Sequence, residues 1–132
     1  MPDPDYCKLY VDSDEEIGRL QSALDEACAD IFDGVPVECP AFKNENFDIN
    51  SRTKVPYNFI ECSRYYVELG AIAPITEQLS AFQSGVAAVV ERLREGGRFV
   101  TASCVFEDVI AAATGWNWTK WDPEPPGRTI TA

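Results

Sequence analysis

The sequence contains no histidine, and its 11 basic side chains are half as many as its 22 acidic ones. Without histidine the chain cannot build a Ser-His or Cys-His nucleophilic pair, and it lacks the commonest protein ligand for transition metals. No C-x-x-C, P-loop or G-x-G-x-x-G sequence occurs, so the motifs of zinc, thioredoxin-like and dinucleotide-binding sites are missing as well. These absences predict a protein without a metal or an organic cofactor.

Long hydrophobic runs are also missing, and none approaches the roughly 18 residues that a membrane span needs. The first ten residues, MPDPDYCKLY, lack the basic and apolar regions that are typical of a secretory signal. The cysteines are odd in number and widely spaced: Cys7, Cys28, Cys39, Cys62 and Cys104. This pattern favours free thiols in a cytoplasmic protein, and a disulfide framework is the alternative.

Acidic side chains are concentrated in the first part of the chain. Residues 1–50 hold 13 acidic and 3 basic side chains, a net charge of −10, whereas residues 51–132 hold 9 and 8, a net charge of −1. Such a surface repels phosphate backbones, so nucleic-acid binding is not expected. It attracts a basic protein surface, although the same charge also serves solubility.

A helix over Asp14–Asp33 is predicted by apolar residues that recur three and four positions apart: Ile17, Leu20, Leu24, Ala27 and Ile31. Ser13 and Glu16 have the spacing of a capping box, in which each side chain satisfies a free backbone N–H of the first turn. Four carboxylates on the polar side are the candidate partner-binding residues: Glu15, Asp25, Glu26 and Asp30. An acidic helix face is often merely solvated, so both interpretations stay open.

A second apolar helix is predicted over Pro74–Glu95, ended by Gly96 and Gly97, and a short one over Glu107–Thr114. Strands are predicted at Tyr6–Val11, Val35–Cys39, weakly near Phe47–Ile49, and at Asn58–Leu69 and Arg98–Phe106. Pro36 favours an edge position for the second strand. The order β-α-β-β-β-α-β predicts an α+β fold with two helices on one face of a mainly antiparallel sheet, a ferredoxin-like sandwich.

The chain is expected to form a single domain over residues 1–121, followed by a flexible, proline-rich tail over 122–132. Just before that tail, all three tryptophans lie within six residues, at Trp116, Trp118 and Trp121. Their rings either fold back and cover the core or form an aromatic binding patch. Trp116 and Trp118 are therefore further candidates for partner contact.

Candidate catalytic groups are few. Cys62 and Cys104 lie in apolar segments, where a buried thiol is normally inert. Carboxylates adjoin the two strongest predicted strands: Glu61, Glu68, Glu107 and Asp108. Acid–base catalysis would require two of them to converge, which linear spacing does not show. Arg64 is expected to form an ion pair with one of the three glutamates. No enzymatic activity is predicted.

The segment LREGGRFVTASCVFED (Leu93–Asp108), with the apolar helix before it and NFIECSRYYVEL (Asn58–Leu69), resembles small cytosolic bacterial immunity proteins encoded beside polymorphic or contact-dependent toxins. In those proteins an L-R-x-x-G-type helix end leads into a strand that closes with a C-x-F-E-D-like sequence. The resemblance covers about residues 58–108 and carries over no individual site residue.

What the resemblance implies is a single-domain binder that blocks the active site of a cognate toxin. The small size, acidic charge and lack of catalytic motifs agree with this, and the charge further suggests that the toxin is basic. The alternative is a regulatory or adaptor domain that binds a small ligand or another protein. A carboxylate enzyme is the third interpretation.

Overall fold

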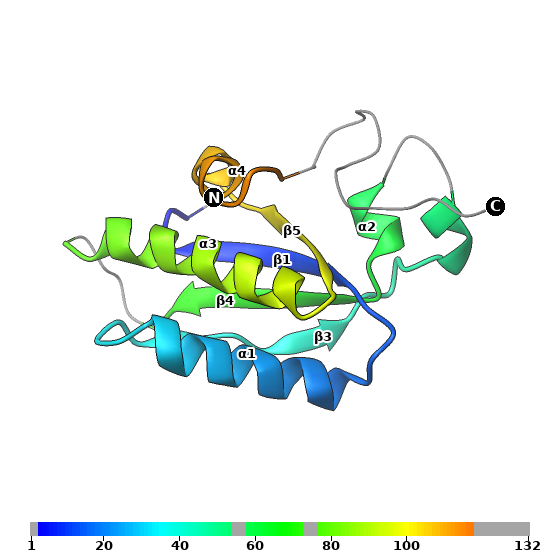
Figure 1. Ribbon diagram of the computed structural model, residues 1–132, viewed down its shortest axis with the longest axis horizontal. Coiled ribbons are helices and arrows are strands. Elements are labelled where there is room, and N and C mark those ends of the chain that lie inside the picture. Colours follow the sequence, from blue (N-terminus) through cyan, green and yellow to red (C-terminus); the bar gives the residue numbers. More distant parts are fainter. Residues whose placement is uncertain (1–2, 54–57, 73–76, 118–132) are drawn as a thin grey trace.

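The computed structural model of the chain describes residues 3–53, 58–72 and 77–117 (Figure 1). Its elements, in order, are β1 (Tyr6–Asp12), α1 (Ile17–Ile31), β2 (Val37–Glu38), β3 (Ala41–Lys43), the 3-10 helix η1 (Ile49–Thr53), α2 (Phe59–Cys62), β4 (Tyr65–Ala71), α3 (Leu79–Glu95), β5 (Phe99–Ser103) and α4 (Glu107–Thr114). Within these residues no helix is both long enough and apolar enough to cross a membrane.

All strand pairs in the described sheet are antiparallel. The order is β2-β4-β1-β5, and β3 also pairs with β4, so β2 and β3 share one edge. At the centre, Leu9 on β1 lies opposite Val67 on β4 and Ala102 on β5. The predicted α+β class is confirmed, and the strand order is that of a ferredoxin-like sandwich with a divided edge strand.

The core lies between the sheet and the two long helices, α1 and α3, which run side by side across one face (Figure 1). Alternate strand residues point into it, because side chains change face at each position of a strand. They are Cys7, Leu9 and Val11 on β1 and Tyr65, Val67 and Leu69 on β4. The helices bury the predicted apolar stripes against them, including Leu24 on α1 and Val86 on α3. Two helices on one face are therefore confirmed.

The strand predicted at Asn58–Leu69 is wrong in its first half, which forms α2. Asn58 starts this helical turn, since its side-chain oxygen accepts hydrogen bonds from the N–H groups of Ile60 and Glu61 at 3.0 and 3.2 Å. The strand begins at Tyr65. Along Asn58–Leu69 the apolar residues fall on both faces of the predicted strand. The change from helix to strand explains this, because the two halves do not share one periodicity.

The weak strand predicted near Phe47–Ile49 is also wrong, because β3 lies earlier, at Ala41–Lys43. The Asn44 side chain ends β3: it accepts from the N–H of Asn46 and donates to the carbonyls of Ile60 and Ser63. Such local bonds from Asn side chains to the backbone favour turns over strands.

The predicted capping box does not form at α1. The Ser13 hydroxyl donates to the Glu15 carboxylate and accepts the Glu15 N–H, and Glu16 caps the helix without a side-chain bond. At α3 the helix starts at Leu79, later than predicted, and Pro74 lies outside the described residues.

The predicted end of the second helix is confirmed at Gly97, whereas Gly96 keeps a negative φ, and α4 also ends at a glycine. After α3 the chain turns at Gly97, where φ is 94°, and after α4 it turns at Gly115, where φ is 96°. Both values lie in the left-handed region, which glycine adopts at little cost because it has no Cβ. The short helix α4 has the predicted bounds, Glu107–Thr114.

Candidate functional site

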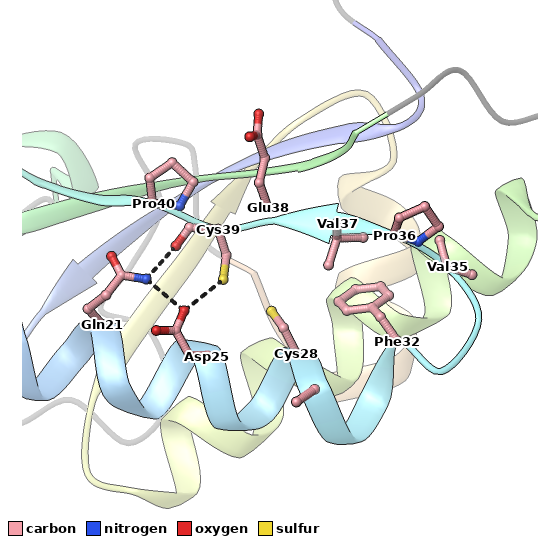
Figure 2. A pocket seen from close by; sticks show the side chains of 11 residues that line it. Gln21, Asp25, Cys28, Phe32, Val35, Pro36, Val37, Glu38, Cys39 and Pro40 are labelled. Carbon is pink, nitrogen blue, oxygen red and sulfur yellow. Dashed lines mark hydrogen bonds between the residues drawn. The ribbon is translucent and has the colours of Figure 1, made fainter.

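The most chemically distinctive concavity lies between α1 and the edge segment that contains β2, and we call it the α1–β2 groove (Figure 2). It has a volume of about 620 Å³. Its lining residues come from one side of α1 and from residues 35–40: Gln21, Asp25, Cys28, Ala29, Phe32, Val35, Pro36, Val37, Glu38, Cys39 and Pro40. Figure 2 shows the side chains of Asp25, Cys28 and Cys39 converging there, while Glu38 points away.

Gln21 fixes the position of the edge segment against α1. Its amide nitrogen donates to the carbonyl of Cys39 at 3.0 Å, and its amide oxygen accepts the N–H of Ala41 at 2.8 Å. The Cys39 carbonyl and the Ala41 N–H lie between β2 and β3, at the edge of the sheet. The Gln21 amide therefore supplies the hydrogen bonds that a neighbouring strand would otherwise make. Gln21 also donates to Asp25 Oδ1 at 3.1 Å and so orients that carboxylate.

Two cysteines meet inside the groove. Cys28 and Cys39 are 7% and 8% exposed, and their thiol groups face each other (Figure 2). Cys39 Sγ lies 3.8 Å from Asp25 Oδ1. The neighbouring Cys28 thiol lowers the pKa of Cys39, against the opposing effects of burial and of the Asp25 charge. The Cys39 thiol and burial raise the pKa of Cys28. This pair was not predicted, since the two residues are eleven positions apart with no motif between them.

All five cysteines are free, as predicted. Cys62, a thiol expected to be inert, is buried and donates to the carbonyl of Ser51. Cys104 is half-buried, and the Cys7 thiol of the central strand is near enough to lower its pKa. The thiols therefore form two pairs, and the pair that lines the groove is Cys28–Cys39.

Three of the four predicted helix carboxylates are exposed on α1, and we call Asp25, Glu26 and Asp30 the acidic α1 surface. Glu26 and Asp30 lie toward α3, where Arg92 approaches their carboxylates at 3.7 and 2.8 Å. Asp25 lies on the groove side. The structure thus spreads the carboxylates over the outer surface of the helix, from α3 to the groove.

Glu15 does not belong to this surface, and its predicted position on an exposed helix face is wrong. It precedes α1, its side chain is 15% exposed, and both of its oxygens accept from Arg98, at 2.6 and 2.7 Å. The Arg98 hydrogen bonds hold the pKa of this carboxyl below its usual value. The loop after β1 places Glu15 beside the start of β5, which explains the contact.

Trp116 is packed against the domain. Its ring lies 4.8 Å from that of Phe99, and the Arg94 guanidinium stands 3.5 Å from its centre. Arg94 also donates to the carbonyls of Trp116 and Val100. For Trp116, these contacts favour a ring that folds back and covers the core over a ring in an exposed aromatic patch. Trp118, Trp121 and the predicted tail lie outside the described residues.

The expected ion pair of Arg64 does not occur among the described residues. Its guanidinium lies 5.3 Å from the centre of the Phe47 ring, beside a second concavity of about 580 Å³. The glutamates proposed as its partners make other contacts: Glu61 accepts from Ser51, Glu68 from Tyr6, and Glu107 from the N–H of Cys104.

These three glutamates therefore have separate local partners. In the part of the chain that the structure describes, no three His, Cys, Asp or Glu side chains are grouped so as to hold a metal ion. The arrangement offers two kinds of chemistry: electrostatic attraction at the acidic α1 surface and thiol chemistry in the α1–β2 groove.

Comparison of the chain with protein-family models, curated proteins and solved structures finds no significant match.

Proposed function

We propose that this chain is an immunity-type protein of the cytoplasm that binds a cognate bacterial toxin through the acidic α1 surface and neutralises it. The observation that carries the proposal is the exposure of Asp25, Glu26 and Asp30 along one helix of a strongly acidic chain. Carboxylates arranged in this way accelerate the approach of a basic protein.

The local charge supports a basic partner. Among the described residues, Arg92 is the basic side chain that pairs with this surface, and its guanidinium reaches Glu26 and Asp30. Arg92 faces two of the three carboxylates, and Asp25 lies on the groove side, so the surface keeps an excess of negative charge. Because the carboxylates of Glu26 and Asp30 are 75% and 61% exposed, their ion pairs with Arg92 are weak and a partner can compete for them.

The groove beside Asp25 adds a place where a partner side chain can be held. Phe32, Val35 and Val37 give it an apolar lining, and Asp25 lies at its rim. A lysine or arginine can bury its aliphatic stem against such a lining while its charged end meets a carboxylate. Interfaces derive most of their affinity from a few anchored side chains of this kind, with exposed charges acting mainly on the association rate.

Neutralisation of a toxin is the direct test. The genes beside this one are searched for a toxin, whose toxic domain is expressed in a sensitive bacterium with and without the chain, and growth and complex formation are measured. Growth rescue together with a stable purified complex is expected. A neighbouring toxin that binds the chain without being inhibited, or a gene neighbourhood without a toxin, would contradict the proposal.

A matched pair of charge variants tests the surface. Asp25→Lys/Glu26→Lys changes the acidic α1 surface, and Glu91→Lys/Glu95→Lys makes the same change of charge at exposed positions of α3. The first variant is expected to slow toxin association about tenfold at low salt, and the second much less, because steering depends on charges near the contact. Equal rates for the two variants would place the interface elsewhere.

A further inference from the structure

The thiol pair of the α1–β2 groove is a site of a different kind from the acidic α1 surface. Figure 2 shows the sulfurs of Cys28 and Cys39 pointing toward each other, one from α1 and one from the residue that follows β2. Each thiol has the largest influence on the pKa of the other, in agreement with their facing positions. Both residues line the groove, so a small reactant that enters it reaches the pair.

We propose that Cys28 and Cys39 form a reversible redox modification site, which a hydroperoxide oxidises to a disulfide linking α1 to the edge segment of the sheet. The co-reactant is a small hydroperoxide, ROOH, where R is hydrogen or an alkyl group. This inference is independent of the proposed toxin binding, because it concerns the chemistry of the thiols alone.

The reaction has two steps. In the first, the Cys39 thiolate attacks one peroxide oxygen; the O–O bond breaks, ROH leaves after taking a proton, and Cys39 becomes a sulfenic acid. In the second, Cys28 loses its proton and attacks Cys39 Sγ; the S–S bond forms, the S–O bond breaks, and water leaves. In total, two thiols and ROOH give one disulfide, ROH and water, and two electrons pass from sulfur to the peroxide.

The position of Cys39 favours the second step, in which the disulfide between Cys28 and Cys39 forms. Its segment is short, since β2 has two residues, and Pro36 and Pro40 flank it at the sheet edge. Edge segments of this kind adjust more readily than a strand paired on both sides, so Cys39 can move to meet disulfide geometry.

The second pair, Cys7 and Cys104, lacks this freedom. Cys7 is 0% exposed and lies on β1, which is paired with β4 on one side and β5 on the other. Cys104 lies in the turn between β5 and α4, where its N–H donates to the Glu107 carboxylate at 3.2 Å. Bridging the two would require a shift of this turn or of the central strand, which carries the core residues Leu9 and Val11. This pair therefore serves as an internal comparison for the groove pair.

The test uses the full reduced chain, treated with hydrogen peroxide at near-stoichiometric concentration. Free thiols are counted by alkylation, and linked peptides are identified by mass spectrometry. The expected result is the loss of two of the five thiols, a linked peptide that joins Cys28 to Cys39, and recovery of all five thiols with dithiothreitol. Five remaining thiols, or a Cys7–Cys104 link in equal or greater yield, would overturn the proposal.

Two single variants, each first checked for native circular dichroism, separate the steps. Cys28→Ser removes the second thiol, so Cys39 is expected to accumulate as a sulfenic acid that dimedone traps. Cys104→Ser changes a thiol outside the groove, and the Cys28–Cys39 link is expected to form at the wild-type rate. Loss of that link in Cys104→Ser, or no dimedone adduct in Cys28→Ser, would contradict the assignment.

Discussion

At the scale of single residues, the ion pair between Glu15 and Arg98 shows how tertiary contact changes the role of a charged side chain. Glu15 is one acidic residue among several in the sequence, and in the structure both of its carboxylate oxygens accept from the Arg98 guanidinium. Both side chains are at most 16% exposed, so solvent screens the pair less than it screens the pairs of Arg92. Glu15 is therefore a structural residue.

We predict that Glu15→Gln destabilises the fold by about 2 kcal/mol at neutral pH, since hydrogen bonds to charged groups contribute about 1.5–3 kcal/mol. The folded-state pKa of Glu15 is depressed, so the pair stabilises the fold above the unfolded carboxyl pKa of about 4.3, and this contribution is lost as pH falls through the lower folded value. Urea unfolding of both proteins from pH 7 to pH 2 measures the difference, which should shrink toward acid pH.

The neighbouring residue provides the control for that experiment. Glu16 is exposed and makes no side-chain cap bond to α1, so Glu16→Gln should change stability by less than about 0.5 kcal/mol. A pH-independent difference between wild type and Glu15→Gln would mean that the carboxylate charge is not what stabilises this contact.

At the scale of elements, the end of α1 comes unusually close to α3. A Cβ placed on Gly85 of α3 would lie 2.4 Å from the ring of Phe32, which follows α1 and is itself buried against Phe82. The helices therefore approach at a position where a side chain would prevent the contact. By contrast, Gly18 on α1 has no atom within 4 Å of its added Cβ.

We predict opposite effects of the same substitution at these two glycines. Gly85→Ala should cost about 1–3 kcal/mol, because the added methyl group overpacks the interface between the helices. Gly18→Ala should stabilise the fold by roughly 0.5–1 kcal/mol, because alanine is the better helix former in open space. Thermal and urea unfolding of the two variants measures both effects, and a stabilising Gly85→Ala would show that Phe32 moves aside freely.

Both edges of the sheet are closed by side-chain amides. Gln21 bonds Cys39 and Ala41 at the β2–β3 edge, and Asn117 bonds both the N–H and the carbonyl of Ala102 on β5, at 2.8 and 2.9 Å. Open edges invite pairing with other chains, so these amides protect the sheet.

We predict that Gln21→Ala and Asn117→Ala each destabilise the fold by about 1–2 kcal/mol, through backbone groups left without a partner. Each variant should also aggregate faster on mild heating than wild type, because an edge is opened. Light scattering during a temperature ramp measures this, with Ser22→Ala, an exposed position of α1, as the control. Aggregation no faster than that of the control would show that the edges are protected by other means.

At the scale of the whole molecule, the distribution of charge matters more than any single pair. The −10 net charge of residues 1–50 lies in the part of the chain that forms β1, α1 and the β2–β3 edge, and the acidic α1 surface belongs to it. Asp25, Glu26 and Asp30 are the part of this charge that α1 exposes, with the groove alongside. This is the physical basis of the proposed association with a basic partner.

We predict that association with the cognate toxin slows steeply with salt, since the screening length falls from about 30 Å at 0.01 M to about 10 Å at 0.1 M ionic strength. The association rate should become less salt-dependent in Asp25→Lys/Glu26→Lys, while the Glu91→Lys/Glu95→Lys control keeps the wild-type slope. Stopped-flow mixing over this range of salt measures the slopes, and a salt-independent wild type would exclude electrostatic steering.

Features that depend on residues within a turn or two of each other could be predicted from the sequence alone. The two apolar helical stripes, the left-handed turn at Gly97 and the bounds of α4 were predicted correctly, and the order of the elements was enough for the α+β class. The start of α2 also had a local signal, the capping residue Asn58. The helix was missed because the apolar residues that follow Asn58 are also typical of a strand. Each of these features draws its stability mainly from neighbouring backbone and side-chain groups.

Contacts between side chains that are far apart in the sequence could be identified only from the tertiary structure. Glu15 and Arg98 are 83 positions apart, and they meet because the loop after β1 runs beside the start of β5. Cys28 and Cys39 meet because Gln21 binds the edge segment to α1. A linear pattern does not encode such contacts, since they depend on strand register and helix packing. The acidic residues were therefore visible in the sequence, but their division into a structural ion pair and an exposed surface was not.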